Sequence, residues 1–245
     1  MKVLNKTTKG VNMLIDKLNF HESTLNGKLE KFKAIGTNTT KNKFCYDRYI
    51  IALEKNKLAN KIIDICGVCY SQKSLKGFRK NNQKALDKNE IFAEKLLTET
   101  DLKQIFIIQS FYRLDHHGEL LTEKCNDKGE VIKKFPKFNM IENFCRIAEY
   151  NPHCSFGLWT KRKDIISKFF KNRVKPKNLI IVYSSLTVDK VIYKVPKYFD
   201  KVFNNVNKDY LKDEQNCTGQ KCIECLRCYK LSDKQEDNII IEKVK

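Results

Sequence analysis

The chain has 245 residues, of which 41% are apolar and 11% aromatic, so it can bury the core of one large domain or two small ones and is not a fibrous chain. Its longest apolar runs, near residues 105–108 and 179–183, are far shorter than the roughly 18 residues that span a membrane, and residues 1–20 lack the apolar stretch of a secretory signal, which predicts a cytoplasmic protein. The net charge of +19 suits a nucleic-acid partner, but only 7 of the 48 basic residues are Arg, so the coding bias of an AT-rich genome explains the Lys content equally well.

The predicted elements alternate between strands and helices. The first third of the chain is expected to hold a weak helix at residues 12–18, a strand entering a loop at 33–39, a helix at 47–65, a loop at 66–70 and a helix at 86–97. The middle is expected to hold a strand at 105–112, a polar loop at 113–119, a turn at 127–129 and a helix at 139–149. Beyond it we expect a strand at 155–160, a helix at 163–172, strands at 179–184 and 201–206, and a short terminal segment after residue 230.

This order of elements predicts an α/β fold with a parallel sheet and crossover helices. We divide the chain into an N-terminal extension at 1–32, an α/β domain at 33–210 and a C-terminal cysteine-rich segment with a tail at 211–245. Sites in parallel sheets lie at the carboxyl ends of the strands, which here are residues 113–119, 160–162, 184–185 and 204–207. These ends are rich in polar and ionisable side chains.

The loop after the strand at 105–112 holds an unusual group of ionisable residues. It reads Arg113-Leu114-Asp115-His116-His117-Gly118-Glu119. Either histidine could act as a base or a metal ligand, Gly118 could let the backbone approach a ligand, and Glu119 could accept from an amine. Lys161, at the end of the next strand, could pair with an anion, whereas Trp159 is expected to fill the core. The alternative interpretation is that all these residues lie in solvated turns and have no role in binding or catalysis.

Ten cysteines in a chain without a secretory signal do not suit a disulfide framework. Four of them, the C-terminal cysteine set, follow the spacing C-x4-C-x2-C-x2-C in Cys217-Thr-Gly-Gln-Lys-Cys222-Ile-Glu-Cys225-Leu-Arg-Cys228. Thiolates suit zinc and iron–sulfur clusters. The compact spacing resembles ferredoxin spacings more than the two separated knuckles of a zinc site, so it favours a cluster and keeps zinc as the alternative.

Cys45, Cys66 and Cys69 form the N-terminal cysteine set. Three thiolates on a [4Fe–4S] cluster leave one iron open to a substrate or cofactor. Two alternatives remain: a redox pair of Cys66 and Cys69, and a zinc knuckle completed by a residue such as His116 or His117. The other cysteines look different, because Cys145 and Cys154 lie in apolar patterns and are expected to be buried as small hydrophobes.

Several segments together resemble the phage "gene product eighty-eight" family over residues 33–230. They are Asn38-Thr39-Thr40 with Cys45, Cys66-Gly-Val-Cys69-Tyr70, Phe111-Tyr-Arg113-Leu-Asp-His116-His-Gly118-Glu119, Phe156-Gly-Leu-Trp159-Thr160-Lys161, and Cys217 to Tyr229. The resemblance implies a phage-type protein in the host cytoplasm and brings no activity with it.

A more distant resemblance is to radical S-adenosylmethionine enzymes. It implies a partial (β/α) barrel, a three-cysteine [4Fe–4S] cluster after the first strand, and a Gly-Gly-Glu after the second that contacts the cofactor, here Gly118 and Glu119 preceded by His117. The usual C-x3-C-x2-C loop is altered, because Ile62 lies four residues before Cys66 and Cys45 would replace the first cysteine. The C-terminal set would correspond to an auxiliary cluster.

The leading hypothesis is therefore an iron–sulfur protein of radical S-adenosylmethionine type, with Arg113, His116, Glu119 and Lys161 lining its pocket. The alternative is a non-catalytic protein that zinc stabilises and that binds nucleic acid or a host protein. A redox sensor or electron carrier is a third interpretation. No G-x-S-x-G, P-loop or G-x-G-x-x-G motif occurs, so lipase-like, P-loop and Rossmann-type functions have no support.

Overall fold

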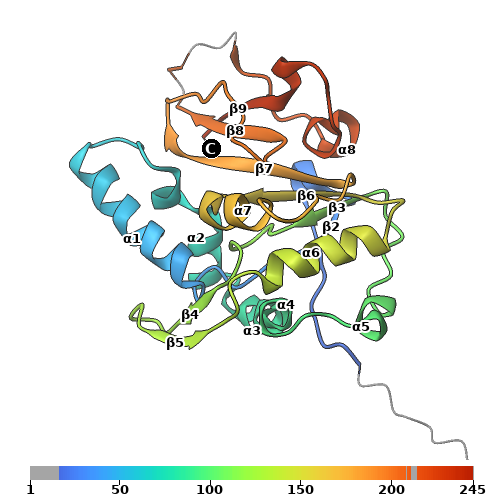
Figure 1. The fold of residues 1–245 in the computed structure, drawn as a ribbon. Coiled ribbons are helices and arrows are strands. Elements are labelled where there is room, and N and C mark those ends of the chain that lie inside the picture. The colour runs from blue at the N-terminus through green and yellow to red at the C-terminus, as the bar shows by residue number, and fades with distance from the viewer. Residues whose placement is uncertain (1–16, 208, 211–213, 245) are drawn as a thin grey trace, which may run out of the picture.

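The computed structural model describes residues 17–207, 209–210 and 214–244, and its centre is one seven-stranded sheet. The strands lie in chain order: β1 (Ser23–Thr24), β2 (Lys33–Ile35), β3 (Phe111–Leu114), β6 (Ser155–Thr160), β7 (Leu179–Val188), β8 (Lys201–Val206) and β9 (Ile239–Lys243). Only β1 is antiparallel to its neighbour, and all other pairs are parallel. Because β1 and β9 are separate edges, the sheet is open and no barrel closes (Figure 1).

Helices connect the parallel strands, as the sequence predicts for an α/β fold. They are α1 (Lys43–Leu58), α2 (Tyr70–Lys76), α3 (Gln83–Asp87), α4 (Ile91–Glu94), α5 (Glu99–Lys103), α6 (Asn139–Tyr150), α7 (Lys163–Phe169) and α8 (Cys222–Cys225). A hairpin of β4 (Glu123–Cys125) and β5 (Val131–Lys134) lies beside the sheet, with the expected turn at 127–129. No helix among the described residues is long and apolar enough to cross a membrane.

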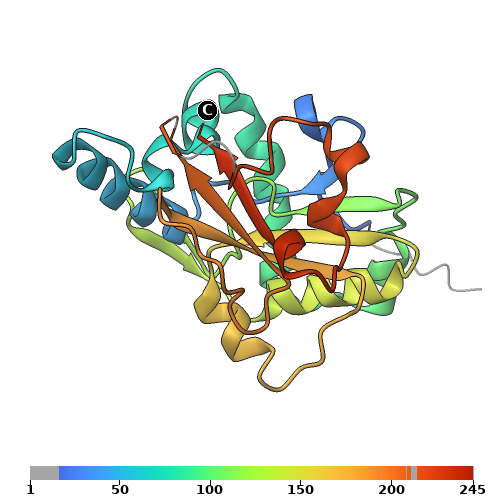
Figure 2. The ribbon, with the colours of Figure 1, turned by 90° about the horizontal axis from the view of Figure 1, so that it is seen from above.

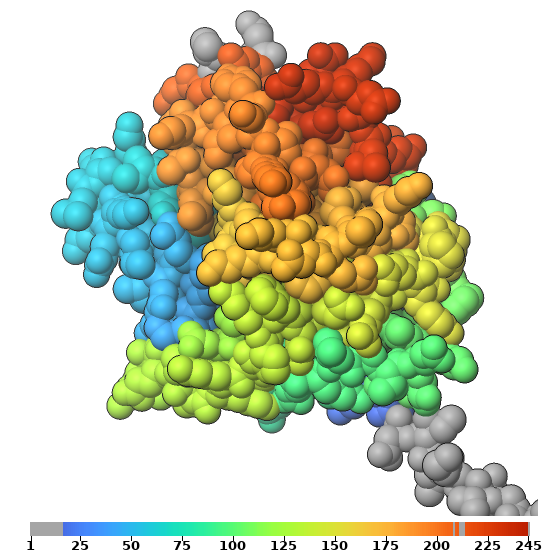
Figure 3. All heavy atoms as spheres, viewed as in Figure 1, coloured from blue at the N-terminus to red at the C-terminus, as the bar shows by residue number. Residues whose placement is uncertain are grey.

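The two faces of the sheet are covered by different layers. On one face, Leu114, Leu158 and Ile181 pack against α6, α7 and the segments around α4 and α5, which forms the main core. Figure 3 shows the atoms of this helical layer covering the sheet on the viewer's side. On the other face, Trp159 and Ile180 pack against the C-terminal segment, which Figure 2 shows lying across the sheet from above. This second face leads into the candidate site.

Several predicted elements are confirmed, and others have different bounds. The strands at 155–160 and 201–206 have the expected ends, and α6 differs from its prediction by one residue. The predicted helix at 163–172 ends at Phe169, and the strand predicted at 179–184 continues to Val188. Part of the weak helix predicted at 12–18 lies outside the described residues.

The predicted helix at 47–65 is α1, which begins at Lys43 and ends at Leu58. It begins early because the Asn42 side chain accepts a hydrogen bond from the Cys45 amide at 3.3 Å, as an N-cap does. It ends early because Asn60 takes a left-handed conformation, with φ of 49°.

The helix predicted at 86–97 is broken into α3, a short 3₁₀ turn at Lys88–Glu90, and α4. The break lies at Asn89, whose fully buried side chain donates hydrogen bonds to the carbonyls of Gly36 and His21. The side chain of Asn89 thus ties the break to the loop after β2.

The strand predicted at 105–112 is displaced, because only residues 111–114 pair with neighbouring strands. In the preceding stretch Ile105 and Ile107 are buried, while Phe106 and Ile108 are exposed. The Asn151 side chain binds the amide of Ile107 at 3.1 Å, so this backbone group is satisfied outside the sheet. At the other end of the chain, the segment after residue 230 supplies β9 rather than a simple terminal segment.

Candidate functional site

A cavity of about 970 Å³ opens at the carboxyl ends of the parallel strands and continues along the face that the C-terminal segment covers. Its walls include all three thiols of the N-terminal cysteine set and, from the C-terminal set, Cys217, Cys222 and Cys228. The predicted residues Arg113, His116, Gly118, Glu119 and Lys161 also line it. The fold therefore brings the two cysteine sets and the strand-end residues to one cavity, as expected of a parallel sheet.

The N-terminal cysteine set is held by α1 and the 3₁₀ turn at Ile65–Val68. The Asp64 side chain accepts a hydrogen bond from the Cys66 amide at 3.1 Å and pairs with Arg48 at 2.8 Å. Gly67 allows the turn to sit directly on α1, since a Cβ there would lie 2.9 Å from the carbonyl oxygen of Ala52. These contacts fix the backbone on both sides of the thiols.

Burial and neighbouring charges set the protonation of these thiols. Burial raises the pKa of Cys45 well above its usual value, and Glu119, Cys69 and Cys66 raise it further. Burial also raises the pKa of Cys66 to about 11, against the opposing effect of Lys161. Both thiols are protonated at neutral pH in the metal-free protein, so metal binding would have to release their protons.

Glu119 connects the carboxyl ends of three strands. Its Oε2 accepts hydrogen bonds from the Thr160 hydroxyl at 2.6 Å and from the Lys161 amide at 2.9 Å. The Lys161 ammonium lies 3.5 Å from Oε1 and donates to the Ser184 hydroxyl at 3.1 Å. Burial disfavours the charge of Lys161, but Glu119 and the thiols of the N-terminal set outweigh that effect and raise its pKa.

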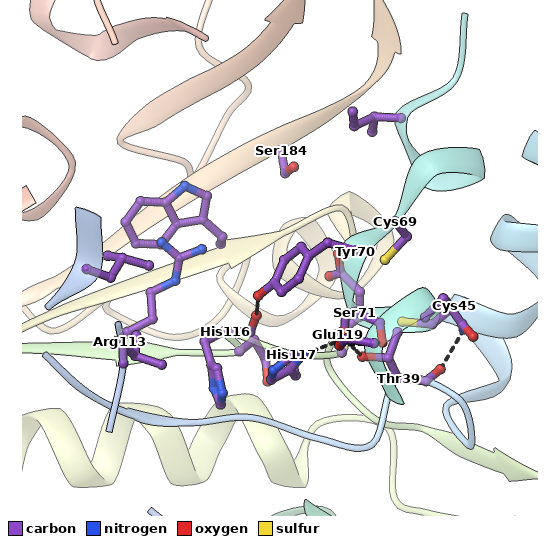
Figure 4. Close-up of a pocket in the computed structure, with 18 of the residues that line it drawn as sticks. Thr39, Cys45, Cys69, Tyr70, Ser71, Arg113, His116, His117, Glu119 and Ser184 are labelled. Carbon is purple, nitrogen blue, oxygen red and sulfur yellow. Dashed lines mark hydrogen bonds between the residues drawn. The ribbon is translucent and has the colours of Figure 1, made fainter. Parts of the chain in front are cut away.

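The two adjacent histidines have different surroundings (Figure 4). The Nδ1 of His117 and the Ser71 hydroxyl are 2.5 Å apart, and Ser71 in turn contacts the Thr39 hydroxyl at 2.5 Å. Burial, with the charge of Arg79, lowers the pKa of His117 to about 4. His117 is thus a neutral side chain at physiological pH.

His116, the histidine predicted as catalytic, lies against Gly36, and its Nδ1 has no hydrogen-bond partner. Burial and the proximity of His117 hold its pKa well below its usual value. The next residue but one, Gly118, has φ of 79°, and a Cβ there would lie 2.0 Å from the Thr37 hydroxyl. Glycine is therefore needed at 118 to fit the loop against Thr37.

Ser71 and Thr39 also reach the cavity, beside Cys45 and Cys69 (Figure 4), although neither was predicted as a site residue. Thr39 lies in the Asn38-Thr39-Thr40 segment and Ser71 follows Tyr70, but only the fold brings them to His117. Trp159 is buried as expected, but it also lines the cavity, with the guanidinium carbon of Arg113 3.3 Å from the centroid of its ring. The predicted burial of Cys145 and Cys154 is confirmed.

The C-terminal cysteine set lies on α8 and the turns around it. Leu226, with φ of 51°, reverses the chain between Cys225 and Cys228. Tyr229 anchors this segment on the sheet by packing between Phe32 and Trp159, at ring-centroid distances of 4.7 and 5.3 Å. Gly157 makes room for it, since a Cβ there would lie 2.7 Å from the Tyr229 ring.

Electrostatic contacts differ within the C-terminal set. Lys28 donates to the Cys217 thiol at 3.6 Å and also pairs with Glu242 on β9. Burial raises the pKa of Cys228 to about 12, while Cys225 is exposed. Three of the four thiols therefore face the cavity, and the fourth lies at the surface.

Within the described residues, no three His, Cys, Asp or Glu side chains are arranged to hold a metal ion. Comparisons with protein-family models, curated proteins and solved structures found no match to this chain. The site must therefore be interpreted from its own chemistry.

Proposed function

We propose that the chain is an iron–sulfur protein whose N-terminal cysteine set holds a [4Fe–4S] cluster with one open iron, and that it acts as an enzyme of radical S-adenosylmethionine type. One observation carries this proposal: three thiols and Glu119 line a single cavity after two adjacent parallel strands, β2 and β3. The open sheet with strands in chain order supports it, because this is the strand order of a partial (β/α) barrel.

The donor chemistry of the N-terminal set fits such a cluster. Thiolates are the usual ligands of iron–sulfur centres, and each iron takes its own thiolate, so the three sulfurs need not meet at one point. Lys161 lies close enough for its positive charge to lower the pKa of Cys66, which helps that thiol to lose its proton. Held by Cys45, Cys66 and Cys69, such a cluster would supply one-electron reduction to a cofactor at the cavity.

The residues around the set would position that cofactor. Glu119 is fixed by Thr160 and the Lys161 amide through Oε2, so its Oε1 is the oxygen that an incoming amine would share with Lys161. Arg113 and His116 line the cavity near Tyr70, whose hydroxyl donates to the carbonyl of His116 at 3.0 Å.

The C-terminal set is the proposed auxiliary centre. Its four thiols fall within twelve residues, and three of them share the cavity with the N-terminal set. A four-thiolate centre has no open position, so its role would be electron transfer or support of the fold rather than cofactor binding.

The test is metal and sulfide analysis, with an absorption spectrum, of protein purified without oxygen. We expect a brown protein with several irons and sulfides per chain, and cleavage of S-adenosylmethionine after reduction. A colourless protein carrying one or two zinc ions would overturn the proposal and favour a zinc-stabilised binding protein. A brown protein that never cleaves the cofactor would leave the cluster and remove the radical chemistry.

A further inference from the structure

Arg113 lies on β3, Asp115 directly follows the last residue of that strand, and both line the cavity. Because Leu114 between them is extended, their Cα atoms are about 6.6 Å apart. Neither makes an ion pair with any residue that the structure describes. The proposed function uses neither charge for cluster binding.

Asp115 has the features of a side chain that binds a ligand. It is 4% exposed, and neither carboxyl oxygen has a hydrogen-bond partner. Its backbone takes φ of 50°, a left-handed conformation that is uncommon for a residue other than glycine. Buried polar groups are normally satisfied, and strained residues gather at ligand sites, so both observations point to a missing hydrogen-bond donor.

Arg113 offers a complementary group. Its guanidinium stacks on the ring of Trp159, and its Nε lacks a hydrogen-bond partner. A stacked guanidinium is held in one plane and presents a rigid fork of N–H donors, which matches the oxygens of a carboxylate or a phosphate. The positive charge of Arg113 acts to lower the pKa values of Cys222 and Cys228. Arg113 therefore lies on the side of the cavity toward the C-terminal set.

We propose that Arg113 and Asp115 form the substrate-recognition subsite of the cavity, which takes a small molecule with an oxyanion and, a few bonds away, an amino or hydroxyl group. Arg113 binds the oxyanion, and Asp115 accepts a hydrogen bond from the second group. That this ligand is a substrate rests on the proposed function, whereas its binding does not. The subsite uses other side chains than Glu119, whose Oε2 is engaged by Thr160 and the Lys161 amide and whose Oε1 the proposed function gives to the cofactor amine.

The position of Trp159 supplies the measurement. It is the single Trp of the chain and contacts Arg113 directly, so its fluorescence reports on a ligand at that guanidinium. The experiment titrates the purified protein with 4-aminobutanoate, butanoate and inorganic phosphate at constant ionic strength, with the iron content of each sample recorded. We expect saturable changes with all three, and about tenfold tighter binding of 4-aminobutanoate than of butanoate, since one charged hydrogen bond contributes about 1.5 kcal/mol.

Matched variants separate the two halves of the subsite. We expect Arg113→Gln to weaken all three ligands at least about tenfold and Arg113→Lys to weaken them less, because Lys keeps the charge without the fork. Asp115→Asn removes the preference for 4-aminobutanoate and leaves butanoate binding unchanged. Arg79→Gln, which removes another cavity-lining guanidinium that lies over Phe78, is the control and leaves all three affinities within about twofold.

The proposal would be overturned if none of the three ligands gave a saturable response. Equal affinities of the wild-type protein and Arg113→Gln would overturn it as well. If Arg113→Gln does not fold, as judged by circular dichroism, Arg113→Lys and Asp115→Asn decide the matter through the same titrations. Because fluorescence needs no cluster, saturable binding by iron-free protein would support this subsite even where the proposed radical function fails. A protein rich in iron that ignores all three ligands would leave the cluster and remove the subsite.

Discussion

The N-terminal cysteine set is carried by elements that are fixed before any metal arrives, whereas the C-terminal set is carried by a short segment held at a few points. The Asn42 side chain accepts a hydrogen bond from the Cys45 amide, and the Asp64 side chain accepts one from the Cys66 amide. The turn that carries Cys66 rests on α1. The C-terminal segment is attached through Tyr229, through the Lys28–Glu242 pair and through hydrogen bonds of Asn216 and Cys217 to β9, while Cys225 remains exposed.

The difference favours the N-terminal set as the site of the proposed chemistry. A reactive centre needs groups whose geometry is fixed by their surroundings, while a closed four-thiolate centre can order its own loop by binding metal. Glu119 and Lys161 lie beside the N-terminal set. The side chains that surround Glu119 and Lys161 come from four strands or from the loops that follow those strands. The difference supports the proposal that the open cluster belongs to the N-terminal set and the closed one to the C-terminal set.

The largest expected effect separates the two sets directly. Cys66→Ala should remove the iron of the first centre and abolish cleavage of S-adenosylmethionine, because two thiolates cannot hold that cluster. Cys222→Ala should keep the first centre and part of the activity. Iron analysis and a cleavage assay measure both, with Cys145→Ala in the main core as the control that changes neither. Unchanged turnover in Cys66→Ala would refute the proposed function.

A smaller effect concerns the Lys–Glu pair beside each set. Lys161→Met leaves Glu119 buried without its cation and should cost about 3 kcal/mol of unfolding free energy. Lys28→Met should cost about 1 kcal/mol, since Glu242 is nearer to solvent. Urea unfolding followed by circular dichroism measures both, and Lys41→Met, whose partner Asp127 is almost fully exposed, serves as the control. Equal losses at 161 and 28 would contradict the assigned difference.

The smallest expected effect is a pH dependence of the unfolding free energy, which arises from His117 near the N-terminal cysteine set. The pKa of His117 is lowered to about 4, from near 6.5 in the unfolded chain, so the unfolded state binds the extra proton between these values. The stabilisation is complete above pH ~6.5 and is lost as the pH falls toward ~4, by about 2–3 kcal/mol. Its neighbours are Arg79, Tyr70, Ser71 and His116, and the pKa of His116 is lowered too.

His117→Gln keeps a polar side chain beside Ser71 but cannot take up the proton. Urea unfolding at pH 7 and at pH 4.5 should therefore show a smaller loss of stability in His117→Gln than in the wild-type protein. The same loss in both proteins would show that His117 is not the residue that titrates.

The sequence was most informative where a regular pattern decides the structure. The apolar periodicity of α6 and the short run of apolar and aromatic residues in β6 predicted bounds close to those observed, because burial enforces these patterns. Hydrogen bonds between residues far apart in the sequence account for the failures: Asn89 lies at the break in a predicted helix, and Asn151 binds the amide of residue 107 in a predicted strand. Such side-chain contacts to distant backbone have no periodic signature.

The same contrast holds for the candidate site. Cysteine spacing and the polar residues after the strands could be recognised from the chain, and the parallel sheet brought them to one cavity. The Ser71–His117 contact and the stacking of Arg113 on Trp159 join residues 46 positions apart in both cases, so only the fold reveals them.

The pairing of β9 with β8 has a consequence for how the protein matures. The backbones of Cys217 and Glu242 pair in an isolated parallel β-bridge, and the Lys28 side chain contacts both residues. The C-terminal set is therefore held in place only after residue 242 has been synthesised. The N-terminal set and Glu119 leave the ribosome more than a hundred residues earlier. Since folding begins from the N-terminal part of a chain during synthesis, the segments that carry the N-terminal cysteine set are available to fold before those that carry the C-terminal set. If both proposed centres form, we expect the N-terminal one to be loaded first.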